Sequence, residues 1–272
     1  MQITVLSLLI PLLSATAATT ADTSISLSEV AAEELLMAVA ERLHGVDQAA
    51  TVIISQINRR DSIRTRYFKY WVHYPRSSHS VIKQTRVEII EPDKAAGQKY
   101  WSLQSTDGSE EKWIYLPGSG KLQQISDRQR RRRELFDFSE LELTHESIAA
   151  HTNTVVESQT LDGREVVLIK SIERSTPRLL KRTKKRTRRR PGYKLLWIDS
   201  EHLVVVKAEF YNSKDKLTRS IKVTETVTLG NYQLAKAIET LDLKKKTRTT
   251  IEIRDLNLGK ISNTAIFEPK PD

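Results

Sequence analysis

The side chains that most often perform chemistry are sparse and scattered in this 272-residue sequence. The six histidines include no His-Glu-x-x-His motif, and the closest pair, His145 and His151, lacks the spacing of metal ligands. Cysteine is absent, so the sequence offers no thiolate ligand, cysteine nucleophile, disulfide or lipid-anchored cysteine. We therefore expect no metal site and no cofactor, and leave open only a metal site assembled from distant strands.

Motifs of nucleophilic and nucleotide chemistry are also missing. The sequence has no Gly-x-Ser-x-Gly elbow, no Gly-Lys-Ser/Thr loop and no Gly-x-Gly-x-x-Gly motif, and Gly118-Ser119-Gly120 is typical of a turn. The acidic pairs Glu110-Glu111 and Glu140/Glu142 resemble common exposed pairs. We expect no catalytic residues and a protein that is not an enzyme. A hydrolase built from dispersed residues is the third-ranked alternative.

Positive charge is concentrated in two short runs. The formal net charge is +10, and Arg128–Arg133 carries five basic residues while Lys181–Arg190 carries eight. Such runs repel themselves and do not pack in a core, so we expect exposed loops, the longer one at about residues 175–191. They lack interleaved aromatic residues for base stacking, which disfavours nucleic acid as a partner.

Two interpretations of the basic runs stay open. The first is a solvated loop without a dedicated partner. The second is transient contact with anionic lipid head groups, which attract basic residues near a membrane surface. The candidate residues for that contact are Arg128, Arg131, Arg132, Lys181, Arg182, Lys184, Lys185, Arg186, Arg188, Arg189 and Arg190.

The N-terminus has the pattern of a secretory signal. An apolar run from Ile3 to Leu13 precedes the small residues 14–18, which offer an Ala-x-Ala cleavage site near Ala17. We expect residues 1–21 to be a signal peptide and the mature chain to be a soluble periplasmic protein without a lipid anchor. The alternative is a buried strand or helix at the N-terminus.

One helix and many strands are expected along the rest of the chain. Ser26 and Glu29 have the spacing of a capping box and Gly45 can stop the helix, which predicts a helix from Ser26 to His44. Short runs rich in Val, Ile, Thr, Tyr and Trp, separated by polar turns, predict antiparallel strands. These strands are Thr51–Asn58, Ile63–Tyr74, Val81–Ile90, Lys99–Gln104, Lys112–Leu116, Lys121–Ile125, Val155–Thr160, Glu165–Ile172, Lys194–Asp199, Leu203–Tyr211, Thr218–Thr226, Tyr232–Asp242 and Thr247–Arg254.

Alternation within the strands indicates a sheet with one apolar face. Phe68, Tyr70, Val72 and Tyr74 share a face by their spacing of two, and residues 204–210 repeat the pattern. A sheet of this kind must curl on itself or carry a helix on its apolar face. We therefore predict a mainly β (α+β) fold: a strongly curved, incomplete antiparallel β-barrel with a helical lid, formed by a single domain over residues 22–272.

Several segments resemble one known family. Lys112–Pro117 with Lys121–Ile125 is similar to the Trp-Leu-Tyr-Leu-Pro hairpin of the outer-membrane lipoprotein-sorting family, which is related to the LolA-like periplasmic carriers. The similarity continues in order at Glu91–Gly97, Phe138–Leu141, Tyr193–Tyr211 and Ile261–Phe267. The resemblance extends from about Gly45 to Pro269, which makes it more specific than any single motif.

This resemblance implies an unclosed barrel whose apolar interior binds lipid. The implied function is a carrier or chaperone, expected to be monomeric, for lipid or lipoprotein acyl chains moving towards the outer membrane. The alternative is a non-enzymatic adaptor of an envelope transporter or complex, with a filled barrel. The candidate cavity-lining residues are Phe68, Tyr70, Val72, Trp101, Trp113, Tyr115, Trp197, Val206 and Phe210.

Overall fold

The structure is a computed structural model that describes residues 27–76, 80–126, 143–174 and 192–270. The predicted signal peptide, both basic runs and the Phe138–Leu141 segment lie outside these ranges. Within them, no helix combines the length and apolar character needed to cross a membrane.

In the part of the chain that the structure describes, one helix precedes the sheet and a short helix divides the strands into two series. The helix α1 (Leu27–Glu41) is followed by β1 (Gln48–Ile57), β2 (Ile63–His73), β3 (Val81–Glu91), β4 (Lys99–Ser105), β5 (Glu110–Leu116), the turn η1 (Pro117–Ser119) and β6 (Lys121–Gln124). After α3 (His145–Ala149) come β7 (His151–Leu161), β8 (Arg164–Glu173), β9 (Tyr193–Asp199), β10 (Val204–Tyr211), β11 (Leu217–Leu229), β12 (Tyr232–Asp242), β13 (Thr247–Leu258) and η3 (Thr264–Phe267).

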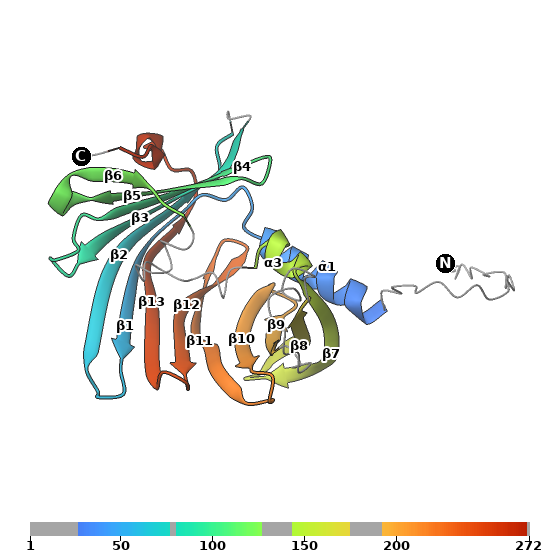
Figure 1. Ribbon diagram of the computed structural model, residues 1–272. Helices are drawn as coiled ribbons and strands as arrows, with labels where there is room; N and C mark the ends of the chain where they lie inside the picture. Colours follow the sequence, from blue (N-terminus) through green and yellow to red (C-terminus); the bar gives the residue numbers. More distant parts are fainter. Residues whose placement is uncertain (1–26, 77–79, 127–142, 175–191, 271–272) are drawn as a thin grey trace, which may run out of the picture.

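The strands form one curved and open sheet. Its 13 strands follow the order β6-β5-β4-β3-β2-β1-β13-β12-β11-β10-β9-β8-β7, so two meanders are joined where β1 pairs with β13. The edges β6 and β7 do not pair with each other, and the sheet curls like a trough with α1 and α3 beside β7 (Figure 1). The predicted mainly β fold, a curved and incomplete barrel with helical cover, is confirmed.

Two hairpins are fixed by the same turn chemistry. Asn58 after β1 and Asn212 after β10 each use the side-chain oxygen to accept two backbone N–H groups of the turn, at 2.8 and 3.2 Å. Asp61 and Asp215 adopt left-handed φ values of 58° and 54°, which Asp tolerates better than most residues. The same arrangement of Asn and Asp thus forms the turns of the hairpins β1–β2 and β10–β11.

The main core lies between the helices and one face of the sheet, called here the inner face. Ala32 and Leu36 of α1 pack in one cluster with Val52, Phe68 and Ile238. On the inner face, the strands contribute alternate residues, as a period of two requires, and register shifts interrupt this alternation in β10 and β11. A smaller separate cluster contains Val166, Leu168, Trp197, Val204 and Val206.

The C-terminal turn covers part of the opposite, outer face. The indole Nε1 of Trp101 donates to the carbonyl oxygen of Ile266 at 2.9 Å. The ring of Phe267 stacks on His73 with 5.3 Å between centroids. Asp47 accepts the N–H of Ile261 at 3.0 Å, and its other contacts join it to His73 and Tyr74. The chain end is therefore held to the sheet by specific polar contacts.

Candidate lipid-binding site

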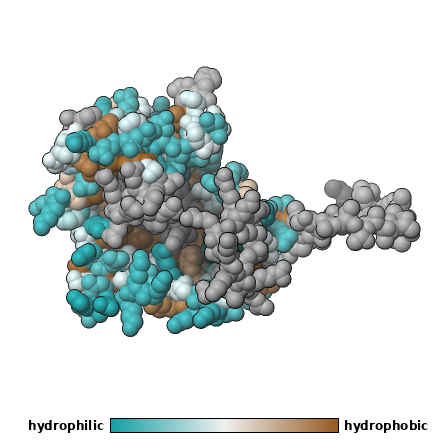
Figure 2. Space-filling model, in the orientation of Figure 1, coloured by the Kyte–Doolittle hydropathy of each residue, from teal (hydrophilic) through white to brown (hydrophobic). Residues whose placement is uncertain are grey.

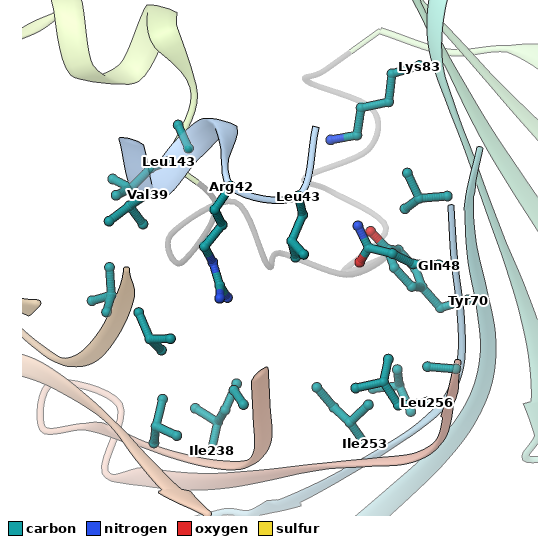
Figure 3. A pocket seen from close by; sticks show the side chains of 18 of the residues that line it. Val39, Arg42, Leu43, Gln48, Tyr70, Lys83, Leu143, Ile238, Ile253 and Leu256 are labelled. Atoms are coloured by element: carbon teal, nitrogen blue, oxygen red, sulfur yellow. The ribbon is translucent and has the colours of Figure 1, made fainter. Parts of the chain in front are cut away.

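An apolar cavity of about 330 Å³ lies between the end of α1 and the inner face (Figure 3). The helix and the turn after it supply one wall, and β1, β2 and β10–β13 supply the other. The lining residues are Val39, Ala40, Arg42, Leu43, Gln48, Ala50, Val52, Tyr70, Val72, Tyr74, Lys83, Leu143, Val204, Val205, Val223, Ala235, Ile238, Ile253 and Leu256.

Strand register explains why the sheet wall is aliphatic. Val52 of β1 lies opposite Phe68 on one side and Ile253 on the other, so all three share the inner face. Ala50 lies opposite Tyr70 in the same way. Ala50, Val52 and Ile253 are small or branched, so they leave room that larger side chains would fill.

The helix wall follows from the spacing of apolar residues in α1. Ala32 and Leu36 are buried in the core, while Val39 and Ala40, about one turn further on, reach the cavity. Leu43 follows in the turn after the helix. The apolar residues of the helix therefore pack in the core near its N-terminal end and line the cavity near its C-terminal end.

The charges in the cavity have one sign among the described lining residues. Arg42 and Lys83 are cations, and no Asp or Glu lines the cavity. The Nη1 of Arg42 donates to the carbonyl oxygen of Gln233 at 2.7 Å, and burial lowers the pKa of Arg42 from its ordinary value. A guanidinium keeps its positive charge in proteins, so this wall of the cavity is electropositive.

A second, larger cavity of about 1020 Å³ adjoins the first over β3–β5. The two share Ala40, Tyr70, Tyr74, Lys83 and Leu143. The larger cavity is more polar, and its lining includes an ion pair of Lys112 with Glu110 at 2.7 Å and a contact of His145 with Glu41 at 2.9 Å. In the space-filling view, brown hydrophobic surface is visible in a hollow above the teal, hydrophilic lower part of the molecule (Figure 2).

The arrangement is suited to holding an apolar chain. A volume of about 330 Å³ falls at the lower end of the roughly 300–1000 Å³ of small-molecule sites. Within the described ranges, no group of three His, Asp or Glu residues is placed to hold a metal ion. The chemical capacity of the site is thus the burial of aliphatic surface beside positive charge.

Four of the nine predicted lining residues lie on the inner face. Tyr70 and Val72 line the smaller cavity. Phe68 is buried in the main core, and Phe210 packs against that core from β10. These four come together because their strands present alternate residues to the same face.

The other five predicted residues lie away from the smaller cavity. Trp101 pairs in register with Trp113, and Lys99 with Tyr115, all on the face opposite Tyr100 and Ile114. Trp197 and Val206 belong to the smaller core cluster. Trp197 lies on the face of β9 opposite Leu196. In β10, a register shift between Val205 and Lys207 turns Val206 away from the face that carries Ala208. One-residue alternation directs these five side chains away from the smaller cavity, and their contact with an acyl chain stays a prediction.

Only some of the cavity residues could have been found from the sequence. Val39, Ala40 and Leu43 fall within the helix predicted from Ser26 to His44. Ile253 and Leu256 face the cavity because β13 pairs with β1, and this pairing of distant segments is not written in local sequence. The cavity is lined mainly by small and aliphatic residues, whereas most of the predicted lining residues are aromatic.

Three solved structures share this fold over most of their length. A DUF1329 family protein from Desulfovibrio piger has a TM-score of 0.68 at 14% identity, with 89% of this chain and 97% of that chain covered. A domain assigned to the outer membrane lipoprotein-sorting proteins of Vibrio parahaemolyticus has 0.65 at 17%, with 88% and 97% covered. A LolA superfamily protein from Nitrosomonas europaea has 0.55 at 15%, with 87% and 97% covered.

The class of protein follows from these similarities and the topology. The chain has the open, curved sheet with helical cover of the LolA-like, lipoprotein-sorting fold, which confirms the resemblance predicted from the sequence at the level of fold. A family model described as "Uncharacterized protein" matches residues 82–270, and the chain belongs to this family. Among curated proteins, none matches the sequence significantly.

Proposed function

We propose that this protein is an exported, non-enzymatic periplasmic carrier that binds the acyl chains of lipids or lipoproteins during transfer towards the outer membrane. The observation that carries the proposal is the apolar cavity of about 330 Å³ between α1 and the inner face. The LolA-like fold supports it, since structures with this fold include a lipoprotein-sorting domain. The chain acts as a monomer in this proposal.

The hydrophobic effect supplies enough free energy for such binding. Each buried methylene contributes about 0.8 kcal/mol, so ten would contribute roughly 8 kcal/mol before ordering costs. A gross gain of that size corresponds to about micromolar affinity, and ordering costs weaken it. Partial burial of one chain therefore suffices for a carrier that must also release its cargo.

The alternative, an adaptor of an envelope transporter, calls for a filled interior. The main core does fill the space beneath most of α1. The hollow at Val39, Val223 and Ile253 favours the carrier. Contact of the two basic runs with anionic membrane surfaces or an envelope transporter is part of the proposal and concerns residues outside the described ranges.

Native mass spectrometry of protein purified from an envelope fraction tests the proposal. We expect wild type to carry acyl lipid or acylated protein. The Ala235→Phe variant should lose it, because the added ring occupies the cavity. The control is Ala237→Phe. Ala237 pairs with Glu252 on the outer face, whereas its neighbour Ile238 faces the cavity, so the added ring should leave the cavity open.

Folding of each variant is checked by circular dichroism. Wild type without bound lipid, and without uptake when challenged with palmitate vesicles, would overturn the carrier function. Equal lipid loss in the Ala235→Phe and Ala237→Phe variants would place the binding site elsewhere.

A further inference from the structure

The most unusual group in the smaller cavity is the guanidinium of Arg42. Figure 3 shows its side chain entering the cavity from the turn after α1, between Val39 and Leu43 and above Ile238 and Ile253. A charged group surrounded by aliphatic side chains loses hydration, which is unfavourable unless a partner replaces the water.

The protein satisfies only part of the hydrogen-bonding capacity of the Arg42 guanidinium. Among the described residues, Arg42 donates one hydrogen bond, from Nη1 to the carbonyl oxygen of Gln233 at 2.7 Å. A guanidinium has five N–H donors in a planar fork. No described lining residue of the cavity is a carboxylate, and the other cation there is Lys83.

The remaining surface of the cavity is mainly aliphatic and therefore complementary to a hydrocarbon chain. Val223, Ile238, Ile253 and Leu256 form a wall of branched aliphatic side chains opposite the helix. Aliphatic walls on one side and a guanidinium on the other match a molecule with an apolar chain and an anionic end.

We propose that Arg42 binds the oxyanion, a carboxylate or a phosphate, at the end of a single acyl chain that occupies the smaller cavity. This inference rests on the proposed carrier function and narrows the cargo to anionic single-chain amphiphiles. Arginine suits the role because its fork can donate two parallel hydrogen bonds to either oxyanion. The carbonyl of Gln233 accepts one N–H of the guanidinium, and the other N–H groups are the donors for the ligand in this proposal.

Isothermal titration calorimetry at pH 8 tests the inference with three probes that share a sixteen-carbon chain: palmitate, 1-palmitoyl-glycerol 3-phosphate and methyl palmitate. Wild type should bind one or both anions about tenfold to a hundredfold more tightly than the ester, as expected for a charge-assisted hydrogen bond. The better of the two anions identifies the head group. In the Arg42→Gln variant this preference should vanish while affinity for the ester stays within about threefold of wild type.

Two further variants separate charge recognition from structure. Arg42→Lys keeps the charge but not the fork, and should retain part of the preference. Arg254→Gln removes an exposed arginine that pairs with Glu252 on the outer face, and should behave as wild type.

The two proposals fail in different ways. Equal wild-type affinity for all three probes, or equal loss of acid and ester binding in Arg42→Gln, would overturn the role of Arg42 and leave the carrier function standing. Absence of binding by every probe would overturn the carrier function itself.

Discussion

The two faces of the sheet around β2–β4 are both apolar, yet one is closed by the protein and the other is left hollow. On the outer face, Trp101 lies beneath the C-terminal turn and is 1% exposed. On the inner face, Tyr70 and Val72 border a cavity of about 330 Å³. Apolar size alone therefore does not mark a ligand site; the presence or absence of a covering segment does.

Two polar groups beside the C-terminal turn contrast with Arg42 on the cavity side. The indole N–H of Trp101 and the carboxylate of Asp47 both have protein partners from the C-terminal segment. Arg42, on the cavity side, has one backbone partner among the described residues. Satisfied polar groups indicate structural packing, and an incompletely paired charge in an apolar hollow indicates a place for a ligand.

The largest expected effect is on the closed face. We expect Trp101→Ala to lower the free energy of unfolding by about 3–5 kcal/mol, because it leaves a cavity under the C-terminal turn. Urea denaturation measures this loss. A change below about 1 kcal/mol would show that the outer face is not tightly packed.

A smaller effect, with a pH signature, is expected at Asp47. We expect Asp47→Asn to lower the free energy of unfolding by about 2 kcal/mol at pH 7, since the charged carboxylate accepts two backbone N–H groups. Burial acts to raise the pKa of Asp47, but the N–H groups of Ile261 and Tyr74 and the His73 ring hold this pKa below its ordinary value.

The sign of the pH dependence follows from the depressed pKa. The stabilisation is complete above the ordinary Asp pKa of about 3.9 and is lost as pH falls through the lower folded-state pKa. The gap between wild type and Asp47→Asn should therefore narrow below about pH 4 in urea titrations. A gap that stays constant down to pH 3 would contradict this assignment.

Truncation beside the hollow should cost less than truncation in the core. Ile251 and Ile253 lie two residues apart on the inner face of β13, but only Ile253 lines the cavity. We expect Ile251→Ala to lose about 2–5 kcal/mol and Ile253→Ala about 1–2 kcal/mol, because the second side chain has fewer contacts to lose. Thermal and urea unfolding compare the two, and equal losses would mean that the cavity is packed in solution.

The smallest effect is expected at Trp113, a half-buried residue on the outer face whose indole N–H contacts Glu111 at 3.3 Å. We expect Trp113→Ala to change the free energy of unfolding by less than about 1 kcal/mol and to leave acyl affinity unchanged. Fluorescent fatty-acid titration measures the affinity. A tenfold loss of fatty-acid affinity in this variant would show that Trp113 takes part in binding.

Much of the fold was predictable because its signals are local. Alternating apolar residues and polar turns predicted the strands, and the capping-box spacing of Ser26 and Glu29 with Gly45 as the stop predicted the helix α1. The short helix α3 was missed, although Thr144 and Ser147 cap it reciprocally in the manner of a capping box.

The site was less predictable because it depends on contacts between distant segments. The pairing of β1 with β13 brings Ile253 beside Val52 from the far end of the chain. Trp101 has the same apolar character as a lining residue, and only the position of Ile266 above it shows that it is structural. The hollow itself arises from small residues such as Ala50 and Ala235, whose importance lies in the volume they leave.

Methyl NMR with a spin-labelled fatty acid tests the central claim most directly. In isoleucine-methyl-labelled protein, binding should broaden the Ile238 and Ile253 resonances, which line the cavity, and spare Ile266, which lies in the outer turn. Broadening of Ile266 with Ile238 and Ile253 unaffected, or no selective broadening at all, would contradict an acyl chain held between α1 and the inner face.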